Sequence, residues 1–355
     1  MYSEDDLQHA VAAGAISAEA ARALRDHVAR LRQNPIADEE HFRLLTGFND
    51  IFVAIACIIL LVAVGSIGMK AGPGGPDDTI VSGLMVTGAS WGLAEYFTRR
   101  RRMALPSILL LIGFIGGIVF AAGSLAMALF PDTGTHGGAL IMAGVAACGA
   151  TGAWLHWRRF AVPITVAAGA AAAATVIGGL LLSVLPDSKT ARDLLLLAAG
   201  LAIFTLAMKW DMTDRSRSTR RSDVAFWLHL TAAPMIAHSL FQLLGVFGQG
   251  QMGMGKALMV IALYIAFGFV ALAIDRRALL VSSLAYVLYA LYTLFQQAGA
   301  VELSAAFTAL VIGSSLLLLS ALWQRARGGV VQILPPALGA RLPHLERPPA
   351  ATPPA

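Results

Sequence analysis

The sequence predicts an all-α fold: a polytopic transmembrane helix bundle of about ten spans with a small N-terminal helical hairpin. Three observations support this fold class. The chain is 57% hydrophobic and only 13% charged, whereas soluble domains carry about 25% charged residues. Apolar stretches of about 20 residues, the length that crosses a bilayer as a helix, recur along the chain. Basic residues gather in every second loop between these stretches.

Residues 1–48 are expected to form a cytoplasmic helical hairpin and a linker. Ser3 can cap the first helix, Gly14 can end it, and Ser17 can cap the second. The Asn34-Pro35 pair ends the second helix. A hairpin of this size is too small to bury a core of its own. We therefore expect residues 1–33 to dock on a protein partner, on a second copy of the chain or on the cytoplasmic loops.

The transmembrane domain is predicted to occupy residues 49–325, and each span is placed on an apolar run of suitable length. The ten spans cover residues 51–69, 79–97, 105–130, 138–157, 161–185, 191–208, 224–247, 257–274, 278–295 and 303–323. The third is long enough to tilt. Small residues four apart favour close helix packing in the third and fourth spans; they are Gly113 and Gly117 in the third, and Gly144, Cys148 and Gly152 in the fourth.

The distribution of Lys and Arg predicts the orientation of the chain. Twenty-two of the 26 basic residues fall in the N-terminal segment, in alternate loops or in the C-terminal tail. The remaining four, Lys70, Lys189, Arg192 and Lys256, lie in the other set of loops. By the positive-inside rule, both termini are cytoplasmic and the number of spans is even. The Pro-rich residues 326–355 are predicted to form a disordered cytoplasmic tail.

Composition also excludes several kinds of function. Cys57 and Cys148 lie in apolar stretches without C-x-x-C spacing or neighbouring His residues, so we expect neither a disulfide framework nor a metal site, and no cofactor. The net charge of +5 comes from basic residues at helix ends. Lipid headgroups and the topology rule explain that placement. The predicted partner is therefore the lipid bilayer and not nucleic acid.

Glu95 is the clearest carboxylate within a predicted span, and it has two interpretations. It lies one helical turn from Arg99 and can form an ion pair at the membrane interface. Alternatively, it is a proton or ion site within the membrane. In the seventh span, His229 and His238 are nine residues apart, so they point to opposite faces unless Pro234 bends the helix.

A polar stripe along the ninth span is the strongest candidate for a ligand site. Spacings of three and four residues place its members on one helix face, and His238 and Gln242 of the seventh span can join it. The candidate polar cavity comprises His238, Gln242, Ser282, Tyr286, Tyr289, Thr293 and Gln296. These side chains either hydrogen-bond between helices or line a hydrated cavity.

The run Ala13-Gly14-Ala15-Ile16-Ser17, followed by Ala20 and Leu24, resembles the N-terminal hairpin of an uncharacterised family of predicted bacterial polytopic membrane proteins, described as a domain of unknown function. The run Phe48-Asn49-Asp50-Ile51-Phe52 is similar to segments of related hypothetical proteins. The resemblance covers mainly the first 70 residues. It implies a membrane architecture and a bacterial inner-membrane location, but no activity, ligand or catalytic residue.

The sequence therefore predicts an integral membrane protein with a structural or interaction role. The alternative is a transporter or channel for a small neutral molecule, favoured by the number of spans and by the polar stripe. Ion coupling is disfavoured because carboxylates are missing from the middle of the predicted spans. An enzyme would need a cluster of His, Asp or Glu side chains at one membrane depth, and the sequence does not indicate one.

Overall fold

The structure is a computed structural model that describes residues 10–24, 48–72, 74, 76–215, 217, 219–246, 253–297, 303–339 and 342–343. The chain divides into two compact units, residues 1–44 and residues 45–355. In the first unit, the structure describes residues 10–24. Residues 10–12 and 18–24 are helical, Gly14 has a φ of 70°, and Oγ of Ser17 caps the second helix by accepting a hydrogen bond from the backbone N–H of Ala20. Ser3 and the Asn34-Pro35 pair lie outside the described residues.

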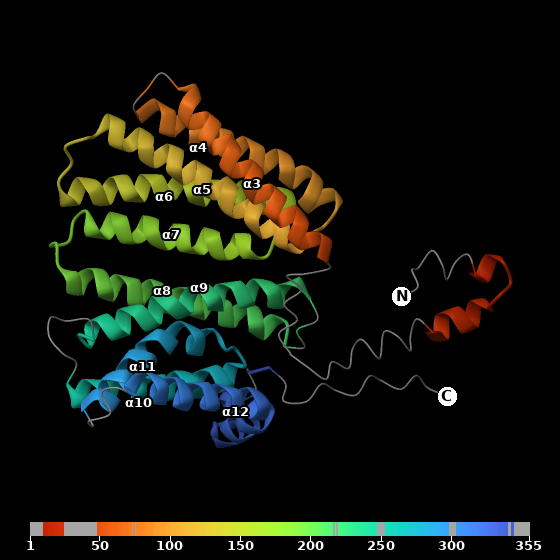
Figure 1. Ribbon diagram of the computed structural model, residues 1–355, viewed down its shortest axis with the longest axis vertical. Helices are drawn as coiled ribbons and strands as arrows, with labels where there is room; N and C mark the ends of the chain where they lie inside the picture. Colours follow the sequence, from red (N-terminus) through yellow and green to blue (C-terminus); the bar gives the residue numbers. More distant parts are fainter. Residues whose placement is uncertain are drawn as a thin grey trace. The chain divides into compact units, whose positions relative to one another are not determined.

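The second unit is a bundle of antiparallel helices joined by short turns (Figure 1). Its helices are α3 Phe48–Ala71, α4 Pro76–Ala94, the π-helix η1 Glu95–Arg100, α5 Ala104–Leu129, α6 Thr135–Phe160, α7 Ile164–Leu182, α8 Lys189–Thr213, α9 Arg220–Leu243, α10 Met254–Ile274, α11 Ala278–Gln297, α12 Ser304–Ile333 and α13 Pro336–Gly339. The described residues contain no strand. The predicted all-α helix bundle is therefore confirmed.

Nine helices of the described residues are long and apolar enough to cross a membrane. The predicted second span, residues 79–97, is not among them because α4 begins with Asp77 and Asp78 and gives way to the charged η1 after Ala94. Nevertheless, α4 packs along both α3 and α5. Together, α4 and η1 form a continuous helical segment that runs beside those two helices (Figure 1).

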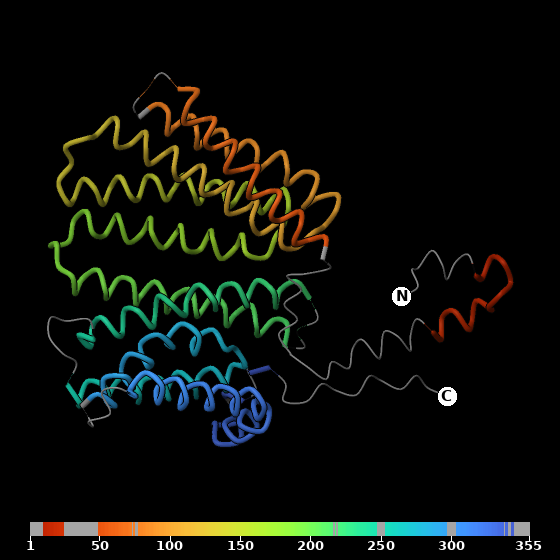
Figure 2. Tube along the Cα trace, in the orientation of Figure 1, coloured from red at the N-terminus to blue at the C-terminus, as the bar shows by residue number. Residues whose placement is uncertain are grey.

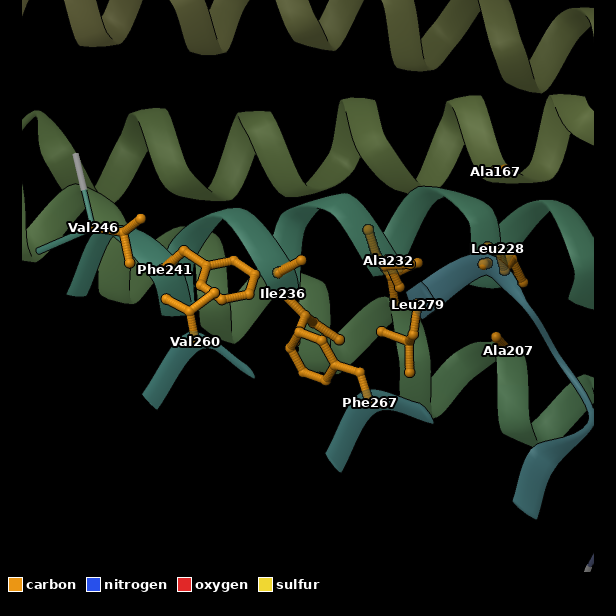
Figure 3. Packing of buried hydrophobic residues seen from close by; sticks show 14 of the residues in the cluster. Ala167, Ala207, Leu228, Ala232, Ile236, Phe241, Val246, Val260, Phe267 and Leu279 are labelled. Carbon is orange, nitrogen blue, oxygen red and sulfur yellow. The ribbon is translucent and has the colours of Figure 1, made fainter. Parts of the chain in front are cut away.

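The helices of this unit are stacked largely in sequence order, from α3–α5 through α6 and α7 to α8–α12 (Figures 1 and 2). The largest apolar core surrounds α9, which is the most enclosed of the nine candidate spans. Phe241 of α9 meets Val260 and Phe267 of α10, while Leu228 and Ile236 extend the core along the same helix (Figure 3). The apolar side chains on the outside of the bundle are suited to lipid contact.

Glycine allows the closest helix contact, as the sequence predicted for the third span. A Cβ on Gly117 of α5 would lie 2.7 Å from the carbonyl oxygen of Gly83 on α4, and one on Gly113 would lie 2.6 Å from Oγ of Ser90. The prediction for the fourth span was only partly right. A Cβ on Gly144 of α6 would meet no atom within 4 Å, and Cys148 is exposed, whereas a Cβ on Gly152 would lie 2.6 Å from Cδ1 of Ile118 on α5.

The Arg-bearing turns lie together at one end of the bundle. Arg159 at the end of α6 reaches η1, Arg220 at the start of α9 reaches the α6–α7 turn, and Arg276 in the α10–α11 turn reaches α8. This alternation agrees with the charge pattern of the loops. Figure 2 shows how successive passes bring these turns to the same end.

The C-terminal boundary differs from the sequence-based prediction. The tail was expected to begin at residue 326, but α12 continues to Ile333 and is followed by the short helix α13. Leu342 is buried and packs near Ala273 and Ile274 at the end of α10. Residues 326–343 therefore contribute to the bundle where they are described, because apolar residues such as Leu342 cover its end. Residues 344–355 lie outside the described part.

Candidate functional site

The structure brings together three of the residues predicted to line a polar cavity. Nδ1 of His238 on α9 lies 2.7 Å from the hydroxyl of Tyr286 on α11. Nε2 of Gln242 lies 3.4 Å from Nε2 of the same imidazole. The Tyr286 ring also stacks on Phe241, with 4.1 Å between the ring centroids. These side chains join α9 to α11 through a hydrogen bond and an aromatic stack.

The other four predicted residues do not join this group. Ser282 is half-buried, and Tyr289 is 42% exposed on the outside of the bundle. The hydroxyl of Thr293 donates to the carbonyl oxygen of Tyr289, and Nε2 of Gln296 donates to the hydroxyl of Tyr292. The latter part of the stripe therefore makes its hydrogen bonds within α11, and the side chains form two separate groups.

Glu95 forms ion pairs at the end of α4. Its carboxylate lies 3.3 Å from Nη1 of Arg99, as the spacing of one helical turn predicts. It also accepts hydrogen bonds of 2.6 Å and 3.0 Å from Nε and Nη2 of Arg159 on α6. The carboxylate side chain is about one-third exposed. This geometry is that of an interfacial link between η1 and α6.

A group of buried charged side chains and one buried Trp connects α8, α9 and α12 with the α8–α9 loop and the α10–α11 turn. We call this group the buried ion-pair network; it consists of Asp211, Arg217, His229, Asp275, Arg276, Trp323 and Arg327. Charged side chains are rarely this enclosed unless they are paired. The network is therefore the most unusual polar feature of the described residues.

One half of the network is centred on Asp211 of α8. Its Oδ1 lies 2.7 Å from Nη2 of Arg276, and its Oδ2 lies 2.9 Å from Nε2 of His229. All three side chains are at most 5% exposed. The same Nη2 of Arg276 also donates to the carbonyl oxygen of Ser222. A single carboxylate thus links α8, α9 and the α10–α11 turn.

The other half is centred on Asp275, which follows α10 in a left-handed conformation with φ 57°. Its Oδ2 lies 2.7 Å from Nη1 of Arg217, and its Oδ1 accepts a 2.7 Å hydrogen bond from Nε1 of Trp323. Nε of Arg327 lies 3.8 Å from Oδ1, and Nη2 of Arg327 donates to the carbonyl oxygen of Pro343. These contacts attach α12 and residue 343 to the α10–α11 turn.

Arg217, in the α8–α9 loop, forms hydrogen bonds to the Asp275 half and is also influenced by the charges of Asp211 and Arg276. Burial and the neighbouring Arg276 lower the pKa of its guanidinium, whereas the carboxylates of Asp275 and Asp211 act in the opposite direction. Because the ordinary pKa of Arg is above about 12, we treat Arg217 as charged. Removing one partner from such a buried pair leaves the other charge without compensation, which costs about 3–5 kcal/mol.

His229 is the one imidazole of the network, a side chain that can both donate and accept hydrogen bonds. With a proton on Nε2, the imidazole donates to Asp211 and leaves Nδ1 as a proton acceptor. That Nδ1 is buried and has no hydrogen-bond partner among the described residues. The described residues contain no group of three His, Cys, Asp or Glu side chains placed to hold a metal ion. The contacts of the network therefore connect helices, and Nδ1 of His229 is left as a free hydrogen-bond acceptor in the described part of the chain.

Sequence reasoning missed this network because the basic residues of these loops already had an explanation in membrane topology. The available signal was acidic: Asp211 and Asp275 occur at span ends in a chain that is only 13% charged. The opposite orientation of His229 and His238 was anticipated. In the structure, His229 contacts Asp211, and His238 contacts Tyr286.

A second buried histidine also escaped the sequence analysis. His156 of α6 is fully buried, and its Nδ1 lies 3.2 Å from Oγ1 of Thr165. Trp91, Phe114 and Phe160 surround its ring, with centroid distances of 4.7–6.4 Å. The aromatic contacts pack α4, α5 and α6 together at this point.

The fold and its apolar helices define the class: a multi-pass helical membrane protein that contacts the lipid bilayer. Comparisons with protein-family models, curated proteins and solved structures find no match. Function must therefore be inferred from the residues of this chain.

Proposed function

We propose that this chain is an integral protein of the bacterial inner membrane with a structural or interaction role. The observation that carries the proposal is that polar side chains contact one another across helices, and that the contacts of Asp211 are buried. His238 meets Tyr286, and Asp211 meets both His229 and Arg276. Contacts of this kind fix helices against one another without a ligand.

The basic ends of the helices support a cytoplasmic position for both termini. In that orientation, the N-terminal segment, residues 1–33, is available to a cytoplasmic protein partner or to a second copy of the chain. Its resemblance to the hairpin of an uncharacterised membrane-protein family supports the same assignment. Within this proposal, the bundle is the membrane anchor and the hairpin is the contact element.

Thiol labelling tests whether water enters the bundle beside the His238–Tyr286 pair. Ser282→Cys is introduced into a chain whose Cys57 and Cys148 are replaced by Ala, and a membrane-impermeant maleimide is applied to both membrane faces. A structural role predicts protection from both sides. Thr133→Cys, in the exposed α5–α6 turn, is the accessible control. Labelling of Ser282→Cys as fast as the control contradicts the structural role.

A second candidate function is a transporter or channel for a small neutral molecule. It is favoured by the placement of the buried ion-pair network at one end of α8–α12, because a gate can open where such pairs separate. Asp275→Asn weakens the pairing with Arg217 and should then speed labelling of Ser282→Cys at least tenfold. Under the structural role, the substitution lowers stability without increasing labelling of the folded protein.

A further inference from the structure

Eight arginines gather on the surface at the end of the bundle where α5, α7 and α9 begin. We call them the arginine-rich surface; they are Arg99, Arg100, Arg101, Arg102, Arg158, Arg159, Arg220 and Arg221, and all are exposed. Direct contacts connect the three segments that carry them. Arg159 of α6 pairs with Glu95 of η1, and Arg220 of α9 donates to the carbonyl oxygen of Ala161 in the α6–α7 turn.

This surface keeps a large excess of positive charge. Glu95 neutralises charge at Arg99 and Arg159, and Asp223 is an exposed acidic neighbour at the start of α9. Even if each carboxylate cancels one guanidinium, six positive charges remain. Phosphate groups complement exposed arginines through charge-assisted hydrogen bonds.

The backbone adopts uncommon conformations along the same surface. The π-helix η1 carries Arg99 and Arg100, and such helices are rare and frequent at functional sites. Arg102 and Ala161 have φ values of 54° and 52°, a left-handed conformation that is costly for residues other than glycine. Both turns that border α5 and α7 thus hold the neighbouring arginines on a fixed backbone path.

Aromatic side chains place this surface at the membrane interface. The guanidinium carbon of Arg158 lies 5.0 Å from the ring centroid of Trp154, which is 54% exposed. That of Arg101 lies 5.5 Å from the ring centroid of Tyr96, which is 42% exposed. Exposed Trp and Tyr are enriched at headgroup level. A phosphate bound here would therefore lie at the depth of a lipid headgroup.

An apolar groove on the outside of the bundle approaches the arginines from the membrane side. It lies between α5 and α6 and is lined by Ile118, Ala147, Cys148, Thr151, Gly152 and Leu155. Leu155 is one helical turn before Arg158 and Arg159 on α6. Ile118 of α5 packs directly on Gly152, because a Cβ at this glycine would lie 2.6 Å from Cδ1 of Ile118. The groove offers an apolar surface to an acyl chain below the guanidiniums.

We propose that this site binds an anionic phospholipid, with its phosphate on the arginine-rich surface at Arg158 and an acyl chain in the α5–α6 groove. The occupant is a lipid and not a free anion because Trp154 and Arg158 each follow a groove residue of α6, Thr151 and Leu155 respectively, by three positions. This inference does not depend on whether the bundle has a structural or a transport role.

Binding is tested with the full chain in detergent, titrated with dioleoyl phosphatidylglycerol and with dioleoyl phosphatidylcholine, while native mass spectrometry counts the retained lipid. We expect the wild-type protein to bind phosphatidylglycerol at least tenfold more tightly. Arg102→Gln combined with Arg158→Gln should weaken that binding roughly 30-fold, from about 1 kcal/mol per basic residue. Cys148→Trp should weaken binding of both lipids by filling the groove.

Two controls separate this site from general charge attraction. Arg325→Gln removes an exposed basic residue from α12 and should leave phosphatidylglycerol binding unchanged. Inorganic phosphate at equal concentration should displace little lipid. The proposal would be overturned if the protein bound the two lipids equally well or if the double variant bound phosphatidylglycerol like the wild type. It would also be overturned if Arg325→Gln weakened binding as much as the double variant does, or if inorganic phosphate displaced all of the lipid. Near-ultraviolet circular dichroism verifies that every variant is folded before binding is measured.

Discussion

Asp211 shows how one residue can connect several transmembrane helices. Its carboxylate faces both His229 and Arg276, and the side chain is only 3% exposed. Desolvation offsets much of the attraction in such a pair, so its net stabilisation is small. The free-energy cost of removing one partner is nevertheless large, because the remaining buried charge then has neither water nor a counter-ion around it.

Asp211→Asn should therefore lower the free energy of unfolding by about 3–5 kcal/mol, since Arg276 stays buried without its counter-charge. The measurement is reversible unfolding in mixed micelles, followed by circular dichroism. Asp187→Asn provides the matched control because Asp187 pairs with Arg192 at a site where both side chains are about half exposed. That pair should contribute less than about 1 kcal/mol. Equal losses in the two variants would show that burial of the network has no energetic importance.

At the scale of helices, glycine contacts determine how closely α4 and α5 approach. A Cβ on Gly117 would lie 2.7 Å from the carbonyl oxygen of Gly83 and 2.9 Å from the backbone nitrogen of Thr87. Backbone atoms cannot rotate away as a flexible side chain can. Even the smallest added side chain must therefore separate the two helices.

Gly117→Ala should destabilise the folded protein by about 1–3 kcal/mol through overpacking. Gly116→Ala is the matched control because it lies one residue away and its added Cβ would meet no atom within 4 Å. The control should be neutral or stabilising by up to about 1 kcal/mol, since alanine favours the helix. Thermal unfolding of both variants in the same detergent gives the comparison. A control variant as unstable as Gly117→Ala would contradict the close-contact explanation.

The helices themselves were predictable because bilayer length and apolar composition impose a strong pattern on the sequence. The contacts between the helices were harder to predict from the sequence. The spacing of Glu95 and Arg99 predicts a local ion pair, but the bond from Glu95 to Arg159 joins residues 64 positions apart. The pairing of Asp211 with Arg276 similarly depends on how α8 and the α10–α11 turn meet. Sequence periodicity assigns a side chain to a helix face but does not identify the helix opposite.

At the scale of the whole molecule, the sidedness of the loops depends on whether α4 and η1 cross the membrane. Together they run from Pro76 to Arg100 and pack beside α3 and α5. If this segment crosses, the Arg-bearing turns are all on one side, as the positive-inside rule requires. If it does not, the turn at Arg101 lies on the same side as the α3–α4 connection.

Single-cysteine variants distinguish these two arrangements. Gly74→Cys marks the α3–α4 connection and Arg101→Cys marks the η1–α5 turn, both in a chain that carries Cys57→Ala and Cys148→Ala. We expect an impermeant maleimide to reach Arg101→Cys only from the cytoplasmic face and Gly74→Cys only from the opposite face. Thr133→Cys in the α5–α6 turn should match Gly74→Cys, because α5 returns the chain across the bilayer. Labelling of Gly74→Cys and Arg101→Cys from the same face would reduce the number of spans to nine and place the two termini on opposite sides.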